Sequence, residues 1–246
     1  MRVLLASMGF YPQWGFYTAL AAAKATFGRL TYDDLVVGSR RIMRALERCD
    51  VRFEISGTEA LDPAQGPYVF VCNHMSVMET QVLPAVISHI RPTTFVAKPS
   101  LMRYPVFRRV LQSFDPIIVT RTDPRSDLQH VLEMGKRKLD AGISVIIFPQ
   151  ARRSEDFDPA TFGSLGWRLA RAAKVPMVPI ALATTAWGKG AWLDDAGPID
   201  PDKPVRFAVG APIEVGTIGG AEAHRQAAEF IARQLAAWSD LGSGRE

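Results

Sequence analysis

Four short apolar runs constrain the fold of this 246-residue chain more than any other feature. They occupy residues 68–72, 94–97, 116–120 and 143–148. Continuous Val, Ile and Phe runs of this length are typical of strands buried on both faces of a sheet. Stretches with helical features follow the first three, at residues 77–90, 102–111 and 126–141, the last with Ser126 as its cap. This alternation predicts an α/β fold, with a mostly parallel central sheet covered by helices on both faces.

The remaining segments complete this pattern on either side. We predict a helix at residues 31–48, which opens with a capping-box-like Thr31-Tyr-Asp-Asp34, and a half-buried strand at residues 51–55. Beyond residue 160 we predict helices at 165–173 and 221–238 and a strand at 205–209. Residues 175–182 are apolar but contain two prolines, which indicates an edge strand or an irregular entry. We therefore expect an N-terminal helical segment at 1–48 and one α/β domain at 49–246.

Composition and charge exclude several classes of protein. Hydrophobic residues make up 48% of the chain and charged residues 22%, which favours a folded core over disorder. The net charge of +4 is too small to indicate nucleic-acid binding, and no nucleic-acid partner is expected. Residues 91 to 174, however, contain 15 Lys and Arg but only eight Asp and Glu. This local positive charge suits an anionic ligand or lipid surface. Two cysteines provide neither a disulfide framework nor a four-ligand zinc site, and no metal or bound cofactor is expected.

The N-terminal segment carries no charge between Arg2 and Lys24, and this length is sufficient to cross a bilayer. Polar residues, glycines and a proline interrupt it, and five aromatic residues crowd its first half. Aromatic rings of this kind favour the headgroup region of a membrane. We therefore expect a helix that lies on the membrane surface, in preference to a membrane span or an ordinary soluble helix. The expected location is the cytoplasmic face of the cell membrane, as a peripheral or monotopic protein.

A histidine and a carboxylate follow the first of the four predicted strands. His74 stands at the end of that strand, and Glu79 lies a little over one turn into the following helix. At this spacing the carboxylate reaches one imidazole nitrogen and fixes the tautomer, and the other nitrogen can take a proton from a hydroxyl. A histidine near a glutamate is more often structural, but the strand-to-helix position favours a general base.

Polar and cationic side chains follow the other predicted strands. The candidate substrate-binding residues, including the neighbour of His74, are Asn73, Lys98, Arg121, Gln150, Arg152 and Arg153. Because the carboxyl ends of parallel strands meet at one edge of a sheet, we expect these groups to lie near His74. Guanidinium groups bind phosphate through a fork of donors, although a solvated loop with scattered charge explains residues 150–153 equally well.

These motifs, in this order, resemble those of the glycerolipid acyltransferase family, which includes bacterial 1-acyl-glycerol-3-phosphate acyltransferases. The resemblance covers roughly residues 50 to 210. The family's N-H-x-x-x-x-D motif is matched at Asn73, His74 and Glu79, so that an HX4E motif replaces HX4D. The other matched positions are Lys98 and Arg121 for the second motif, Phe148, Pro149, Arg153 and Ser154 for F-P-E-G-T-R-S, and 175–180 for V-P-x-V-P.

The resemblance implies transfer of a fatty acyl group from a thioester of coenzyme A or acyl carrier protein to a hydroxyl of a lysolipid acceptor at the membrane. His74 is then the general base with Glu79 behind it, and Lys98, Arg121, Arg152 and Arg153 hold the acceptor's phosphate. Residues 175–180 become core or a wall beside the acyl chain. Gln150-Ala151-Arg152 replaces the family's E-G-T, which alters the acceptor pocket. Two alternatives remain open: a lipid-binding protein of the same fold without turnover, and a thioesterase.

Overall fold

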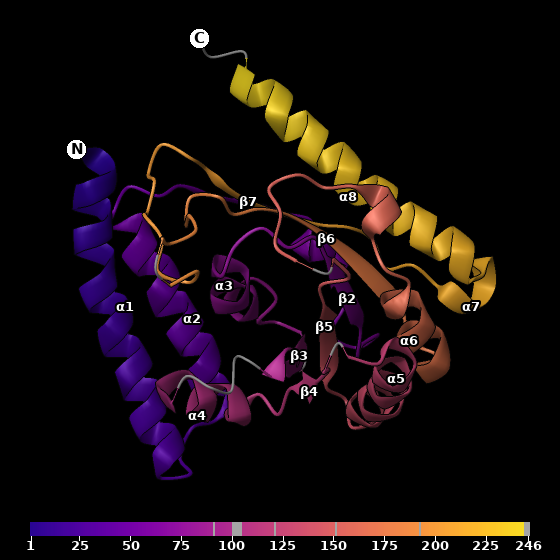
Figure 1. The fold of residues 1–246 in the computed structure, drawn as a ribbon. Helices are drawn as coiled ribbons and strands as arrows, with labels where there is room; N and C mark the ends of the chain where they lie inside the picture. The colour runs from indigo at the N-terminus through magenta and orange to yellow at the C-terminus, as the bar shows by residue number, and fades with distance from the viewer. Residues whose placement is uncertain (91, 100–104, 121, 151, 192, 244–246) are drawn as a thin grey trace.

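The computed structural model describes residues 1–90, 92–99, 105–120, 122–150, 152–191 and 193–243. Within these ranges seven strands form one sheet in the order β1-β7-β6-β2-β5-β3-β4 (Figure 1). The strands are β1 (Phe53–Ser56), β2 (Val69–Cys72), β3 (Thr93–Ala97), β4 (Ile117–Ile118), β5 (Ser144–Ile147), β6 (Met177–Ala183) and β7 (Val205–Val209). Every neighbouring pair is parallel except β6 and β7, which are antiparallel. The predicted mostly parallel sheet is confirmed.

Helices cover both faces of this sheet. They are α1 (Arg2–Thr26), α2 (Tyr32–Glu47), α3 (Met78–Val86), α4 (Pro105–Ser113), α5 (Pro124–Asp140), α6 (Leu165–Ala173), α7 (Val215–Ile218) and α8 (Gly220–Ser243), with short 3-10 turns at Thr58–Ala60 and Pro159–Thr161. Helices α1 to α3 pack on one face, and α5, α6 and α8 pack on the other (Figure 1). The prediction of helices on both faces is confirmed.

The central strands show why their sequences are apolar throughout. In β2, Phe70 and Cys72 contribute to the core beneath α1 to α3, whereas Val69 and Val71 contribute to the core beneath α5, α6 and α8. Successive side chains of a strand point to opposite faces, so a strand covered on both faces, such as β2, has no position that faces solvent. Each fully buried side chain of this size contributes roughly 1.5–3 kcal/mol to folding relative to an exposed one.

The structure corrects the predicted position of the proline-containing strand. Residues 175–182 were expected at an edge or in an irregular entry, but β6 lies inside the sheet between β2 and β7. Of the two prolines, Pro176 precedes β6. Pro179 lies in β6 but opposite the chain that follows β7, because β7 ends at Val209. There Pro179 only accepts a hydrogen bond, from the backbone N–H of Gly210 at 2.8 Å. Pro179 thus joins the chain beyond β7 through its carbonyl, which does not require the N–H that proline lacks.

Two other strands are less regular than their sequences suggested. The apolar run at 116–120 forms only the two-residue strand β4, because it lies at the edge of the sheet and pairs with β3 alone. Strand β1 lies at the other edge, and the alternation predicted for residues 51–55 holds from buried Val51 to exposed Glu54 but fails at Ile55, which is 39% exposed. An edge strand has neighbours on one side only, and apolarity by itself does not reveal that position.

The helix ends confirm one predicted cap and correct another. The capping box at the start of α2 is present. The Thr31 hydroxyl accepts a hydrogen bond from the Asp34 N–H, and the Asp34 carboxylate accepts one from the Thr31 N–H. Helix α5 was expected to be capped by Ser126, but Asp123 is the cap and accepts from the N–H groups of Arg125 and Ser126. Pro124 then occupies the first helical position, where its missing N–H is not needed.

Helix α1 packs against the body of the protein through most of its aromatic residues, which were expected at a membrane. Phe10 is fully buried, and Tyr11, Trp14 and Tyr17 pack against the same core. The exposed apolar side chains of α1 and its end are instead Leu4, Leu5, Met8, Phe16, Leu20 and Phe27. Among the residues that the structure describes, none of the helices combines the length and hydropathy that a membrane crossing requires.

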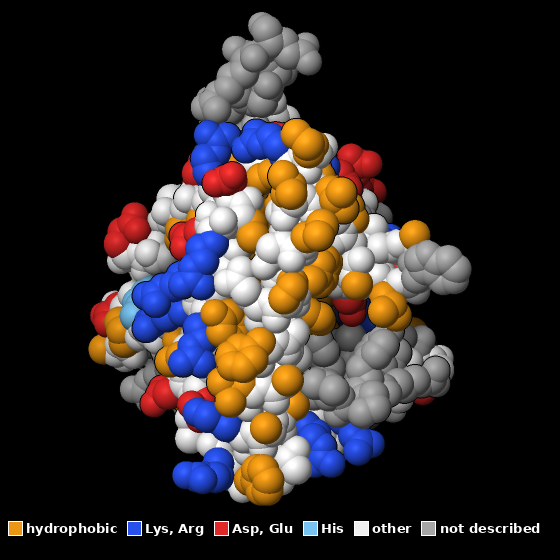
Figure 2. Space-filling model, turned by 90° about the vertical axis from the view of Figure 1, so that its left-hand side faces the viewer, with side chains coloured by type: hydrophobic (Ala, Val, Ile, Leu, Met, Phe, Trp, Pro, Cys, Tyr) orange, Lys and Arg blue, Asp and Glu red, His pale blue; other side chains and the backbone are white. Residues whose placement is uncertain are grey.

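The face of the molecule that carries α1 is both apolar and basic. Figure 2 shows hydrophobic side chains running along α1, with Lys and Arg side chains gathered beside them. The neighbouring helix α2 exposes Arg40, Arg41, Arg44 and Arg48. We call the exposed apolar residues of α1 and these four arginines the α1–α2 face.

Candidate active site

The carboxyl ends of β2, β3 and β5 open into one cavity of about 1140 Å³. His74 follows β2, Lys98 follows β3, and Phe148 follows β5, and all three line the cavity. Helices α2, α4 and α5 supply much of the remaining wall. The groups that follow the strands in sequence therefore meet at one edge of the sheet, as parallel pairing requires.

His74 and Glu79 are in contact. The Nδ1 atom of His74 faces Oε2 of Glu79 at hydrogen-bonding distance. Glu79 lies in the first turn of α3, and the chain turns back between β2 and this helix so that the two side chains meet. The predicted pairing of an imidazole with a carboxylate is confirmed.

The Glu79 carboxylate is fully buried and receives several hydrogen bonds. Its Oε1 atom accepts from the backbone N–H groups of Met75 at 2.6 Å and Ser76 at 2.8 Å, and from the hydroxyl of Thr184 at 2.7 Å. A buried carboxylate needs such donors to compensate for lost hydration. These donors also fix the orientation of the carboxylate, and therefore that of the imidazole bound to Oε2.

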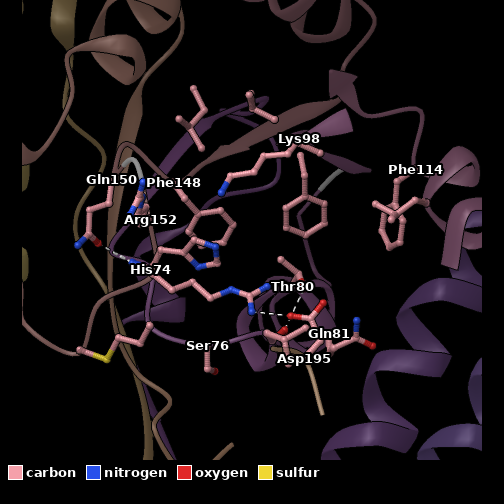
Figure 3. Close-up of a pocket in the computed structure, with 18 of the residues that line it drawn as sticks. His74, Ser76, Thr80, Gln81, Lys98, Phe114, Phe148, Gln150, Arg152 and Asp195 are labelled. Carbon is pink, nitrogen blue, oxygen red and sulfur yellow. Dashed lines mark hydrogen bonds and ion pairs between the residues drawn. The ribbon is translucent and has the colours of Figure 1, made fainter. Parts of the chain in front are cut away.

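The ring of His74 is held from a second side by Phe148. The two rings stack with centroids 4.3 Å apart and planes inclined by 25°. With Nδ1 directed at Glu79, Nε2 is the nitrogen left for the cavity, which His74 lines (Figure 3). The side chain of His74 remains 18% exposed, so a hydroxyl group in the cavity can approach it.

Cys72 lies two residues before His74, yet it does not provide a reactive thiol. Its side chain is fully buried in the core beneath α1 to α3. Burial, reinforced by the negative charge of Glu79, raises the pKa of the Cys72 thiol well above its ordinary value. The thiol therefore stays neutral near pH 7, and a cysteine nucleophile is not available at this site.

Two of the predicted substrate-binding residues hold the protein framework. The Asn73 side chain is 1% exposed and exchanges two hydrogen bonds of 2.8 Å with the backbone of Leu182, so it ties β2 to β6 and does not line the cavity. Gln150 lines the cavity but is buried, and its Oε1 atom accepts from the backbone N–H of His74 at 2.6 Å. The prediction that Asn73 binds substrate is therefore wrong. Gln150, also predicted to bind substrate, instead has its side-chain oxygen bound to the backbone of His74.

The predicted cationic residues gather at the same cavity. Lys98, Arg152 and Arg153 all line it, and Figure 3 shows Lys98 directed toward the rings of His74 and Phe148. Arg153 donates from Nη1 to Oδ1 of Asp195 at 2.5 Å. Arg121, predicted as another anion-binding residue, lies outside the described residues.

The cavity also has an apolar wall beside this polar group. The apolar side chains contributed by α2, β3, α4 and the turn after α4 are Leu35, Ile42, Phe95, Val110, Leu111 and Phe114. Residues 175–180, which were considered as a wall for an acyl chain, do not line the cavity and belong to the core. The apolar surface comes instead from the helices that cover the sheet and from β3.

Comparison with known families decides which proteins this chain resembles. A family model described as Acyltransferase matches residues 52–183, which is more than half of the chain and includes His74, Glu79, Lys98, Arg152 and Arg153. The chain belongs to this acyltransferase family. The resemblance to glycerolipid acyltransferases that the motifs indicated is confirmed.

Several proteins similar to this acyltransferase are described as 1-acyl-sn-glycerol-3-phosphate acyltransferases. It is 31% identical over 150 residues to the 1-acyl-sn-glycerol-3-phosphate acyltransferase of Pseudomonas aeruginosa, a match covering 61% of this chain and 56% of the relative. It is 33% identical over 132 residues to a 1-acyl-sn-glycerol-3-phosphate acyltransferase of Chlamydomonas reinhardtii, covering 53% of this chain and 38% of the relative. The matched part of the chain therefore spans about half or less of the length of these relatives.

A solved structure shares the fold of this acyltransferase over almost its whole length. The crystal structure of the 1-acyl-sn-glycerophosphate acyltransferase PlsC of Thermotoga maritima superposes with a TM-score of 0.75. The match covers 97% of this chain and 98% of the other at 18% sequence identity. The two chains therefore share one architecture, N-terminal helices included.

Two residues of this acyltransferase site were missed from the sequence. Thr184 follows β6 directly and binds Glu79, and Asp195 follows in the connection to β7 and binds Arg153. The position of Thr184 at a strand end was a usable signal, because the same signal indicated His74 and Lys98.

Proposed function

We propose that this protein transfers a fatty acyl group from an acyl thioester to a hydroxyl group of an anionic lysolipid, of the 1-acylglycerol 3-phosphate type. The contact of His74 with the buried Glu79, at the wall of a cavity with cationic and apolar parts, carries this proposal. The family of the chain and the names of its relatives agree with it. The donor is a thioester of coenzyme A or acyl carrier protein.

The proposed reaction needs a base but no enzyme-bound intermediate. Nε2 of His74 takes the proton of the acceptor hydroxyl while the hydroxyl oxygen attacks the thioester carbonyl carbon. The carbon–sulfur bond then breaks, and the departing thiolate receives the proton from the imidazolium. Glu79 stabilises that imidazolium and keeps the proton of the neutral ring on Nδ1, as a carboxylate partner does for other histidine bases.

The two parts of the cavity suit the two parts of such substrates. Cations at the carboxyl ends of the strands, Lys98, Arg152 and Arg153, attract a phosphate and orient the nearby hydroxyl. The apolar wall beneath α2 and α4 suits an acyl chain. At about 1140 Å³, the cavity exceeds the roughly 300–1,000 Å³ of ordinary small-molecule sites, as a lipid substrate requires.

The direct test is a product assay with the purified protein. Palmitoyl-coenzyme A or palmitoyl-acyl carrier protein is supplied together with 1-oleoylglycerol 3-phosphate, and the lipids are separated by mass. We expect a diacylglycerol phosphate and an equivalent amount of free thiol. Free palmitate and thiol without the diacyl product would instead indicate a thioesterase. Bound lipid without any product would indicate a binding protein, and either result contradicts the proposal.

We propose further that the α1–α2 face lies on a membrane. Leu4, Leu5 and Met8 are each more than 60% exposed, which is costly in water and favourable in the headgroup and acyl boundary. The arginines of α2 beside them suit anionic headgroups. The cavity is lined by Tyr17 and Thr18 of α1 and by residues of α2, so this placement gives a lipid substrate a short path to the site.

Charged residues in the apolar row are expected to release the protein from vesicles. Leu5→Glu combined with Met8→Glu should lower binding to vesicles of phosphatidylglycerol and phosphatidylcholine by at least about tenfold, because each buried side chain of this kind contributes roughly 1.5–3 kcal/mol. Sedimentation with the vesicles measures the bound fraction. Ile218→Glu on α7, where the side chain is also exposed, is the matched control and should bind normally. Unchanged binding of the double variant would contradict the proposed orientation.

Substitution is preferable to deletion of α1 in this experiment. Phe10 of α1 is fully buried and its ring lies 4.8 Å from that of Trp187. Deleting the helix would expose this core and confuse loss of folding with loss of membrane binding. Leu5 and Met8 are 61% and 65% exposed, so both can be replaced without disturbing the packing.

A further inference from the structure

Arg153, one of the cationic residues proposed to bind the acceptor's phosphate, already forms an ion pair with a carboxylate of the protein. Oδ1 of Asp195 accepts a hydrogen bond of 2.5 Å from Nη1 of Arg153, and both residues line the cavity with His74. Figure 3 shows Asp195 and His74 in this cavity. Their side chains are 31% and 30% exposed, so the pair is half-buried at the cavity wall. Within the described ranges, Arg152 next to it forms no ion pair.

The position of Asp195 is set by the connection between β6 and β7. We call residues 188–198 the β6–β7 loop; the structure describes all of them except 192. The loop is closed at its base, where the N–H of Gly188 donates to the carbonyl of Pro198 at 2.9 Å and Trp187 pairs with Ile199. A further hydrogen bond of 2.9 Å joins the N–H of Ala196 to the carbonyl of Leu193. The carboxylate is thus carried by a closed loop.

The β6–β7 loop is also bound to α1. The hydroxyl of Tyr11 donates to the carbonyl of Gly197, and the N–H of Ile199 donates to the hydroxyl of Ser7 at 2.9 Å. On the other side of the ion pair, the backbone next to Arg153 is fixed by a hydrogen bond of 2.9 Å from the Ser154 N–H to the His74 carbonyl. Both partners therefore start from fixed backbone positions, and their contact is a property of the folded site.

We infer that Asp195 determines acceptor affinity by competing with the acceptor's phosphate for Arg153. This inference rests on the proposed function, in which the acceptor is anionic. A phosphate that approaches Arg153 competes with the Asp195 carboxylate, because two anions at one guanidinium repel each other. The apparent affinity of the site for phosphate is then reduced by the fraction of molecules in which Asp195 holds Arg153.

The opposite role for Asp195 predicts the opposite result. If the carboxylate served to hold Arg153 in the position that binds phosphate, removing its charge would weaken phosphate binding. Asp195→Asn distinguishes the two roles, because the amide oxygen still accepts a hydrogen bond from Arg153 but carries no charge. Asp202→Asn is the matched control. Asp202 forms the same kind of ion pair, with Nη1 of Arg2, but it does not line the cavity and its side chain is 59% exposed.

The experiment measures the binding of inorganic phosphate to the full chain by calorimetry, and the KM for 1-oleoylglycerol 3-phosphate. We expect Asp195→Asn to bind phosphate about fivefold more tightly than the unsubstituted protein and to lower the KM by a similar factor, the upper range for an ion pair of this exposure. Asp202→Asn should change either value by less than about twofold, because Asp202 does not line the cavity and because solvent and salt screen an exposed charge. The unfolding temperature of each variant confirms that it is folded.

Unchanged or weaker phosphate binding by folded Asp195→Asn would overturn the inference, as would an equal gain in Asp202→Asn. The binding measurement needs no turnover. If no diacyl product forms with any variant, the proposed function fails, whereas the phosphate affinities still decide whether Asp195 competes for Arg153.

Discussion

Replacing His74 with alanine is expected to lower acyl transfer by about 10²–10⁴-fold, the usual contribution of a general base. The loss follows from the geometry of the site, in which Nδ1 of His74 faces Glu79 and Nε2 is left for the acceptor hydroxyl. The measured quantity is kcat/KM for the formation of the diacyl product from the acyl thioester. Binding of the lysolipid should change little, because the cations of the cavity remain.

Two further variants make the His74 experiment decisive. His74→Gln keeps a polar side chain of similar length next to Glu79 and should be as inactive as the alanine variant. His89→Ala removes an exposed histidine that contacts only the carbonyl of Thr58 among the described contacts, and it should retain full activity. Activity of His74→Ala within tenfold of the unsubstituted protein, with folding intact, would exclude His74 as the base.

Replacing Glu79 with glutamine is expected to lower kcat by about 10³–10⁴-fold, comparable to the loss when the carboxylate partner of another catalytic histidine becomes an amide. The amide oxygen must take the place of Oε1, because Met75, Ser76 and Thr184 all donate to that atom. The amide nitrogen then donates to Nδ1 of His74. The ring is held with its proton on Nε2, so it cannot accept a proton from the hydroxyl.

Glutamine has almost the same shape as glutamate. A large loss of kcat in Glu79→Gln would therefore result from the lost charge and the changed tautomer of His74, and not from altered packing. Glu79→Asp is the comparison variant, because it keeps the charge and restores the acid that is usual at this position in the family. It should be more active than Glu79→Gln, although its shorter side chain cannot reach His74 and all three donors without a backbone shift. A Glu79→Gln variant as active as Glu79→Asp would contradict the proposed role of the carboxylate.

The α/β fold and the place of the active site were predictable from local features of the sequence. Strands buried on both faces, such as β2 and β5, appear as continuous apolar runs, and the polar residues that follow them gather where parallel strands end. His74 and Glu79 are five residues apart, so a strand, a turn and a helix start were enough to predict their contact.

Which face of α1 packs against the rest of the protein could not be predicted from local sequence features. Its aromatic residues suggested a membrane surface, but Phe10 packs in the core against Trp187, which lies far away in sequence. Aromatic rings are favourable both in protein cores and at the headgroup level of a membrane. Composition alone therefore does not decide between the two environments.

The sequence by itself determined the class of fold, the edge of the sheet that carries the site, and the pairing of His74 with Glu79. The tertiary structure alone decided that Thr184 holds the Glu79 carboxylate and that Asp195 engages Arg153. These partners are 105 and 42 residues apart, and they meet because β6 lies beside β2 and the β6–β7 loop is bound to α1. The physical reason is that side-chain spacing governs contacts within one turn or strand, whereas strand order is set by packing of the whole core.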